Sequence, residues 1–167
     1  MKVIVDTNVP LVANGAAPQA SMQCAVVCAH RLNAICAQDI LVLDDGWYII
    51  NEYKHQLHQS GQPGVGDTFL KWVLTNWANP FRCELVHLTP KEVEQAGRDF
   101  VEYPQDDALA DFDPSDRKFV AVAVAHPGHP PILNATDSDW WNYRDALEQH
   151  NVRVDFLCPD ALFMRQD

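Results

Sequence analysis

Short apolar runs typical of buried strands alternate with longer helical segments along this chain. The opening run Lys-Val-Ile-Val is short and β-branched, and helical stretches separate it from similar runs further on. The runs expected to form strands are residues 2–5, 40–43, 85–88, 132–133 and 152–157. Because consecutive parallel strands need a crossover connection, the alternation predicts a parallel sheet covered by helices on both faces. The fold class is therefore α/β.

Helical segments are placed by apolar spacing and by the residues that begin and end them. Pro10 is expected to begin the first helix, residues 17–37 form a long Ala- and Cys-rich run, and residues 47–59 form an amphipathic one. Later helices are predicted from Asp67 or Thr68 to about Trp77, from Pro90 onward, over residues 117–126, and from residues 137–140 to about His150. Residues 103–114 are interpreted as an acidic loop.

The length of 167 residues suits one substantial core, so we expect a single domain over residues 1–167. No stretch approaches the roughly 20 apolar residues that cross a bilayer. The opening residues MKVIVD lack the cationic region and cleavage site of a signal peptide. These features predict a cytoplasmic protein without a membrane partner.

The five cysteines occupy positions 24, 28, 36, 83 and 158, with no CxxC pair and no paired zinc spacing. Their odd number suits a reducing compartment. Cys24 and Cys28 lie one helical turn apart and could bind a metal. The preferred interpretation is that both are small buried apolar residues.

Acidic residues stand where this fold would bring strand ends and helix starts together. Asp6 closes the first strand, Asp137 and Asp139 follow the fourth, and Asp116 opens a very apolar helix. Glu52 lies inside a helix, at the edge of its apolar stripe. Ligand sites of open parallel sheets lie outside the carboxyl ends of the strands, so we expect these side chains to gather there.

Clustered carboxylates require either protons or cations. Two carboxylates about 5 Å apart repel by roughly 3 kcal/mol at an effective dielectric constant of about 20. Mg²⁺ and Mn²⁺ prefer carboxylate and water oxygens and support phosphodiester hydrolysis. Taken singly, each acid is also explained as a helix cap, a first-turn acid, a turn residue or a solvated helix acid. Their joint placement favours a metal site.

Four stretches in order resemble the motifs of the PIN-domain nuclease family. They are VIVDTN with Asp6, IINEYKHQL with Glu52, DPSDRKFVAVAVA with Asp116, and PILNATDSDW with Asp137 and Asp139. Order, spacing and flanking hydrophobicity agree over nearly the whole chain. The resemblance implies one three-layer α/β/α PIN-like domain with a central, mainly parallel sheet. It also implies a Mg²⁺- or Mn²⁺-dependent endoribonuclease whose substrate is single-stranded RNA.

The same resemblance assigns roles to individual residues. The catalytic acids that hold metal directly or through water are Asp6, Glu52, Asp116 and Asp137. Asp139 supports them at the metal, and Thr7 or Asn8 would steady Asp6 by hydrogen bonding. Thr136 and Ser138 are candidate hydroxyls for contact with water or phosphate. Many family members are toxins silenced by a small antitoxin and dimers are common, so an antitoxin partner and a homodimer are further implications.

Two other functions stay open at this point. The net charge of −11 disfavours nucleic acid, since phosphate binding is mostly an effect of Lys and Arg. A catalytically idle PIN-like module that binds a protein or RNA partner is therefore the main alternative. A response-regulator receiver also places acids at strand ends, but the regions of His87 and Asn134 lack its phosphoacceptor Asp and late Lys. The segment 61–111 is longer than in the smallest family members.

Overall fold

The computed structural model describes residues 1–92 and 99–163, in which five parallel strands form one sheet in the order β3-β2-β1-β4-β5. The strands are β1 (Lys2–Val5), β2 (Ile40–Asp44), β3 (Cys83–Val86), β4 (Ile132–Asn134) and β5 (Val154–Phe156). The α-helices are α1 (Asn8–Ala13), α2 (Met22–Gln38), α3 (Tyr48–Gln56), α4 (Val65–Asn76), α5 (Arg117–Ala125), α6 (Ser138–Glu148) and α7 (Asp160–Phe163). Two 3₁₀ turns, η1 (Asp107–Leu109) and η2 (Pro114–Asp116), precede α5. The predicted α/β class is confirmed.

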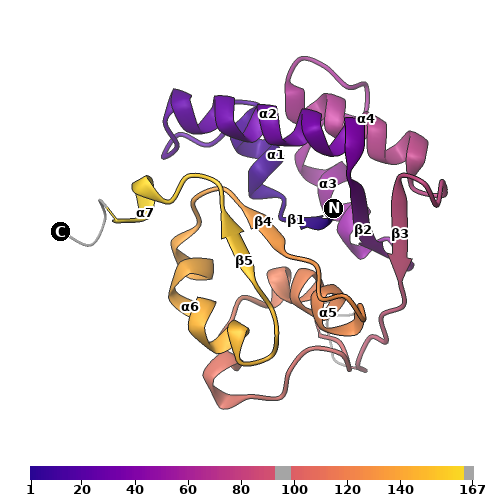
Figure 1. Cartoon of the computed structure of the whole chain (residues 1–167), viewed down its shortest axis with the longest axis vertical. Coiled ribbons are helices and arrows are strands. Elements are labelled where there is room, and N and C mark those ends of the chain that lie inside the picture. The colour runs from indigo at the N-terminus through magenta and orange to yellow at the C-terminus, as the bar shows by residue number, and fades with distance from the viewer. Residues whose placement is uncertain (93–98, 164–167) are drawn as a thin grey trace.

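Helices cover both faces of the sheet and give the three-layer α/β/α architecture predicted. In Figure 1, α1, α2 and α4 lie together above the strands, while α5 and α6 lie below them. α5 packs directly on β1, β2 and β4. α3 contacts β2 and touches both α4 and α5. The third helix thereby links the two helical layers near the strand ends.

The core lies on both faces of the central strands, between them and the helices that cover them. Val3, Ile4 and Val5 of β1 are fully buried, as are the five consecutive residues of α5 at 119–123. A strand with helices on both faces buries every side chain, which explains why its sequence is continuously apolar. The buried Trp140 at the start of α6 packs edge-on against Phe112, which anchors the acidic loop to the core.

The first turn of α4 is hydrogen-bonded by Asn14, the residue that ends α1. The helix begins at Val65, not at Asp67 or Thr68, and Asp67 Oδ2 accepts a hydrogen bond from Gly64 N at 2.9 Å. Asn14 Oδ1 accepts from Gly66 N at 2.7 Å, which satisfies another donor of the first turn. A Cβ on Gly66 would lie 2.1 Å from the Pro10 carbonyl oxygen. Glycine at this position therefore allows α1 and α4 to touch.

Other boundaries also differ from the sequence-based expectations. Residues 17–21 form a turn, and α2 begins only after Ser21, whose hydroxyl accepts from Cys24 N at 3.1 Å. β3 lies two residues earlier than predicted, β5 is shorter, and α7 was not predicted. Pro90 forms an antiparallel bridge with Phe100, and the rest of the helix expected there falls on 93–98, outside the described residues.

The interpretation of Cys24 as a reduced apolar residue is wrong, because it forms a disulfide with Cys158. The interpretation of Cys28 as a small buried residue agrees with the structure, in which it is a buried free thiol. Spacing gave no indication of the pair, since the two cysteines are 134 residues apart in sequence. Among the helices of the described ranges, none is long and apolar enough to cross a membrane.

Candidate metal centre

The candidate site lies where the strand order reverses. β1 pairs with β2 on one side and with β4 on the other, so the carboxyl ends of β1 and β4 are neighbours. The chain passes from β1 to β2 and reaches β4 only after 87 residues that include β3 and α5. Such a switch point leaves a crevice outside the carboxyl ends of the strands. Asp6 follows β1 into this crevice, and residues 135–137 follow β4.

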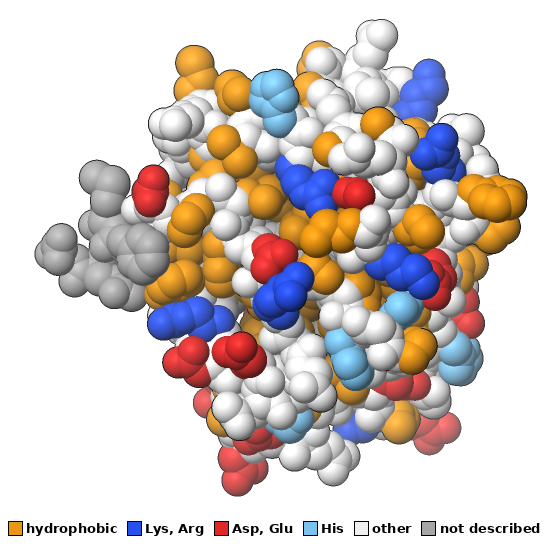
Figure 2. Space-filling view, viewed as in Figure 1, with side chains coloured by type: hydrophobic (Ala, Val, Ile, Leu, Met, Phe, Trp, Pro, Cys, Tyr) orange, Lys and Arg blue, Asp and Glu red, His pale blue; other side chains and the backbone are white. Residues whose placement is uncertain are grey.

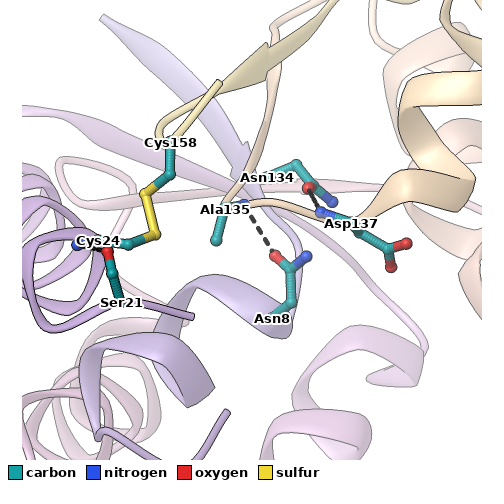
Figure 3. The surroundings of a disulfide bond; sticks show 7 residues. All are labelled: Asn8, Ser21, Cys24, Asn134, Ala135, Asp137 and Cys158. Atoms are coloured by element: carbon teal, nitrogen blue, oxygen red, sulfur yellow. Dashed lines mark hydrogen bonds between the residues drawn. A yellow bond between two sulfur atoms is a disulfide. The ribbon is translucent and has the colours of Figure 1, made fainter. Parts of the chain in front are cut away.

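Asp6 is held by Asn134, the last residue of β4. Asn134 Nδ2 donates to Asp6 Oδ2 at 3.1 Å, and its Oδ1 accepts from Asp137 N at 3.0 Å. One fully buried amide therefore joins the first and fourth acidic motifs, and Figure 3 shows its contact with Asp137. The backbone N–H of Asn8 lowers the pKa of Asp6, while the Asn8 side-chain Oδ1 accepts from Ala135 N at 3.1 Å.

Glu52 reaches the cluster because α3 is fixed at two points. Asp44 caps the helix, accepting from Tyr48 N at 2.8 Å and Ile49 N at 2.9 Å. The Tyr53 hydroxyl then donates to the Val5 carbonyl, next to Asp6. These contacts bring the neighbouring Glu52 to the end of β1.

The Glu52 carboxylate accepts hydrogen bonds from two other segments. Thr7 Oγ1 donates to its Oε2, so Thr7 steadies Glu52 instead of Asp6. Lys118 Nζ donates to its Oε1 at 2.8 Å and also donates to the Ser115 carbonyl. The Lys118 side chain is only 8% exposed, so this ion pair is shielded from water.

Asp116 lies at the junction of η2 and α5, and its side chain caps neither element. The turn is shaped instead by Asp113, whose Oδ1 accepts from Ser115 N and Ser115 Oγ, both at 2.9 Å. Asp116 therefore contributes its charge to the crevice without serving as a helix cap. This separates it from the purely structural interpretation of a first-turn acid.

Asp137 is the N-cap of α6, and its Oδ1 accepts from Asp139 N at 2.9 Å. The interpretation of Asp137 as a helix cap is therefore correct. Its other carboxylate oxygen, Oδ2, does not take part in the capping hydrogen bond. Asp139 and Ser138 are exposed. Thr136 is 5% exposed, and its hydroxyl oxygen has no hydrogen-bond partner among the described residues.

A hollow of about 230 Å³ lies beside Asp137. Its lining residues are Asn8, Leu11, Val12, Ala17, Gln19, Thr136, Asp137 and Ser138. Amide and hydroxyl groups thus share the hollow with apolar side chains from α1. Three of the four predicted supporting residues, Asn8, Thr136 and Ser138, line it, and Thr7 does not.

The acids act on one another electrostatically. Burial raises the pKa of Asp6 well above its ordinary value, and Asp116, Glu52 and Asp137 raise it further. Burial also raises the pKa of Asp116 to about 7, with Glu52, Asp113 and Asp137 adding to the rise and Lys118 opposing it. The pKa of Asp137 is raised by burial, Asp139 and Asp113. The fold therefore brings the four predicted catalytic acids into one field, with Asp139 at its margin.

The acids of the site are donors of the type that hard divalent cations prefer. Carboxylate oxygens are the preferred ligands of Mg²⁺ and Mn²⁺, and raised carboxyl pKa values mark a place where positive charge would be stabilised. Within residues 1–92 and 99–163, no three acidic side chains bring their oxygens within 4.8 Å of one another. Mg²⁺ commonly keeps several waters and binds through one or two carboxylates, so an open acidic cluster suits it.

Basic side chains near the site are already engaged. Arg117 donates to the carbonyls of Phe112 and Ala110, and Arg144 lies over the Trp141 ring at 3.9 Å. Lys54 lies 5.8 Å from the centroid of the Trp47 ring. On the face in Figure 2, Lys and Arg side chains stand singly, several beside acidic ones, without forming a stripe.

Sequence reasoning missed three members of the cluster, namely Asn134, Lys118 and Asp113. The signal for Lys118 was its position two residues after Asp116, next to Arg117 and directly before an apolar run. Asn134 was a polar residue ending a buried strand, and Asp113 was noted only as part of a turn. No family model, no curated protein and no solved structure matches this chain. The site is therefore argued from its own geometry.

Replacing Asn134 by Ala should destabilise the protein by about 1.5–3 kcal/mol, because one of its lost hydrogen bonds goes to a carboxylate. Urea denaturation of the metal-free protein measures the change. Asn142→Ala, an exposed change on α6, is the matched control and should shift the free energy of unfolding by less than about 0.5 kcal/mol. Equal values for the two variants would show that the Asn134 bridge contributes nothing.

Proposed function

We propose that this protein is a metal-dependent endoribonuclease that hydrolyses phosphodiester bonds in single-stranded RNA. The observation that carries the proposal is the mutual electrostatic influence of Asp6, Glu52, Asp116 and Asp137 at the carboxyl ends of β1 and β4. Four separate segments contribute these acids. A structural cap needs one acid and gains nothing from the repulsion of three others.

Asp6, Glu52, Asp116 and Asp137 would hold Mg²⁺ or Mn²⁺, directly or through water, with Asp139 supporting Asp137. The bound cation would supply Lewis-acid activation of the phosphodiester and of the attacking water. Asn134 keeps Asp6 and Asp137 in place, and Thr7 does the same for Glu52. Lys118 brings a positive charge to the crevice. This charge would stabilise a substrate phosphate that binds next to it.

The hollow beside Asp137 supports a single-stranded substrate. Apolar walls from Leu11 and Val12, with amides from Asn8 and Gln19, match the flat face and polar edge of a base. A base can enter such a hollow only when it is unstacked, as in single strands and loops. Few Lys and Arg side chains near the site are free to contact phosphates. This agrees with weak binding of the RNA backbone and with an RNA affinity that depends little on salt.

Cleavage of a mixed panel of single-stranded and structured RNAs and DNAs tests the proposal. With Mn²⁺ or Mg²⁺ we expect cuts within single-stranded RNA, and with EDTA we expect none. Metal-dependent cleavage of DNA alone would overturn the RNA assignment. Cleavage that persists in EDTA would exclude the acidic cluster as its source. A role as the toxin of a toxin–antitoxin pair extends the proposal, and growth arrest on expression would test it.

The Lys118–Glu52 ion pair favours a second candidate, a catalytically idle PIN-like module that acts through protein or RNA binding. The Lys118 ammonium already neutralises one of the four acids without a metal. Thermal denaturation with and without Mn²⁺ separates the two functions. A ligand that binds only the folded state raises the melting temperature, so a shift supports the nuclease. Absence of any shift, together with absence of cleavage, would favour the idle module.

A further inference from the structure

A second group of potential metal ligands lies away from the acids, between α2 and the segment after β5. Cys24 is on the first turn of α2, and Cys158 follows β5. Their disulfide joins the two segments, and Cys158 N donates to the Ala135 carbonyl at 3.0 Å (Figure 3). The backbone hydrogen bond holds Cys158 in place independently of the disulfide.

A third sulfur completes this group. Cys28 lies one turn further along α2, is fully buried and carries a free thiol. Its sulfur and those of Cys24 and Cys158 all lie within 4.8 Å of one another. In the part of the chain that the structure describes, this is the one group of three Cys, His or acidic ligands so close together.

The three sulfurs are near enough to one another to form a zinc site once the Cys24–Cys158 bond is open. A Zn–S bond of about 2.3 Å in tetrahedral geometry places two sulfurs about 3.8 Å apart. Cys28 already lies on the buried side of the group. Cys24 and Cys158 need only small side-chain rotations once their mutual bond is open. Both belong to segments whose backbones are anchored, by the Ser21 cap and by Ala135.

The remaining coordination position has access to solvent. A hollow of about 150 Å³ is lined by Cys24 and Cys158 together with Ser21, Gln23 and Asp160, but not by Cys28. A cation held by the three sulfurs would therefore face this hollow on its fourth side. A water molecule fits that position, as in zinc sites with three protein ligands.

We propose that Cys24, Cys28 and Cys158 form a redox-gated site for a soft divalent cation, with Zn²⁺ as the expected occupant. The disulfide closes the site in the oxidised protein. A dithiol reductant opens it by supplying two electrons and two protons to the Cys24–Cys158 bond, and is itself oxidised to a disulfide. The three thiols then form three Zn–S bonds and release three protons. The site is chemically distinct from the acidic cluster, because thiolates select soft cations over Mg²⁺.

Cys28 is the least accessible of the three sulfurs. It is fully buried and does not line the hollow, so it offers no exposed thiolate for thiol–disulfide exchange. A cation that enters from the hollow can displace the thiol protons and remain in contact with all three sulfurs.

Titration with Co²⁺, a spectroscopic substitute for Zn²⁺, tests the proposal on the 167-residue chain after reduction by a phosphine. We expect one equivalent of Co²⁺ to produce a thiolate-to-cobalt charge-transfer band that Zn²⁺ abolishes. The oxidised protein should show no such band. Cobalt bound at the carboxylates would not produce it either, so the acidic cluster does not interfere. Absence of the band in the reduced protein would overturn the proposal.

Variants of single cysteines identify the ligands. Cys28→Ser should weaken Co²⁺ binding more than about 100-fold, since even losing a hydrogen-bond partner of a ligand costs 10–100-fold. Cys36→Ser, a change on the same helix but outside the group, is the matched control and should bind as the unchanged protein does. Equal affinity of the two variants would contradict the assignment of Cys28.

A second measurement needs no substitution and covers the case in which Cys28→Ser does not fold. The reduced protein is alkylated with and without Zn²⁺, and each cysteine is followed by peptide mass spectrometry. Zn²⁺ should protect Cys24, Cys28 and Cys158 while the half-buried Cys36 reacts at an unchanged rate. Protection that is equal at Cys36 and Cys158, or absent at Cys158, would overturn the proposal.

Discussion

Replacing Asp116 by Asn is expected to reduce metal-dependent RNA cleavage at least ~100-fold and to stabilise the metal-free protein. The first effect follows because a neutral amide is a weaker cation ligand than a carboxylate. The second follows because burial disfavours the Asp116 carboxylate and because Glu52, Asp113 and Asp137 repel it. Removing its charge should raise the free energy of unfolding by about 1–3 kcal/mol at neutral pH. Cleavage assays and urea denaturation in EDTA measure the two effects.

Opposite changes in activity and stability distinguish this prediction from simple damage to the fold. Asp145→Asn removes the same charge from an α6 side chain that is 86% exposed, so it is the matched control. The control should leave cleavage unchanged and alter stability by less than about 0.5 kcal/mol. An Asp116→Asn protein that cleaves RNA normally would remove Asp116 from the site. An Asp116→Asn protein that is less stable than the unchanged protein would show that favourable interactions offset the charge of the Asp116 carboxylate in the fold.

Raising the pH should destabilise the metal-free protein, which is the second large effect expected. The pKa of Asp116 rises on folding from an ordinary value of 3.8 to about 7, and the pKa values of Asp6 and Asp137 are raised as well. Between these values the folded chain binds more protons than the unfolded chain. The free energy of unfolding therefore falls as the pH rises through this window, by at most about 4 kcal/mol for Asp116.

Mn²⁺ should reverse most of this loss, because the cation replaces the protons that the carboxyl groups release. Urea denaturation at about pH 5 and about pH 8, in EDTA and in Mn²⁺, gives the four free energies of unfolding needed. Asp116→Asn should flatten the pH dependence in EDTA, and Asp145→Asn should not. A free energy of unfolding that rises from the lower to the higher pH in EDTA would contradict the raised pKa values.

Local patterns were enough to predict the fold class. The continuous apolar run of β1 and the apolar surface of α5 are both consequences of burial on all sides, and the sequence displays this directly. The start of α4 was missed because its cap comes from Asn14, which is 52 residues from Gly66 in sequence. The predicted position of β3 was two residues too late. The strand is only partly buried, so the alternation of apolar and polar residues along it is weak.

The acids of the candidate site were found because each stands at a strand end or a helix start. Their partners were harder to find, since Asn134 and Lys118 acquire their roles only through contacts with distant segments. A single sequence contains no record of such contacts. The Cys24–Cys158 disulfide was missed for the same reason. Its two cysteines belong to elements that the sequence places at opposite ends of the chain.

The strand order has a consequence for how the protein is made on the ribosome. β1 emerges first, but its partner β4 and the Asn134 amide that holds Asp6 are synthesised 128 residues later. Non-local strand pairing of this kind cannot form until both strands are available. A nascent chain still attached to its messenger therefore lacks the crevice until β4 has been synthesised. For a protein proposed to cut RNA, this order of synthesis delays assembly of the cutting site until that point.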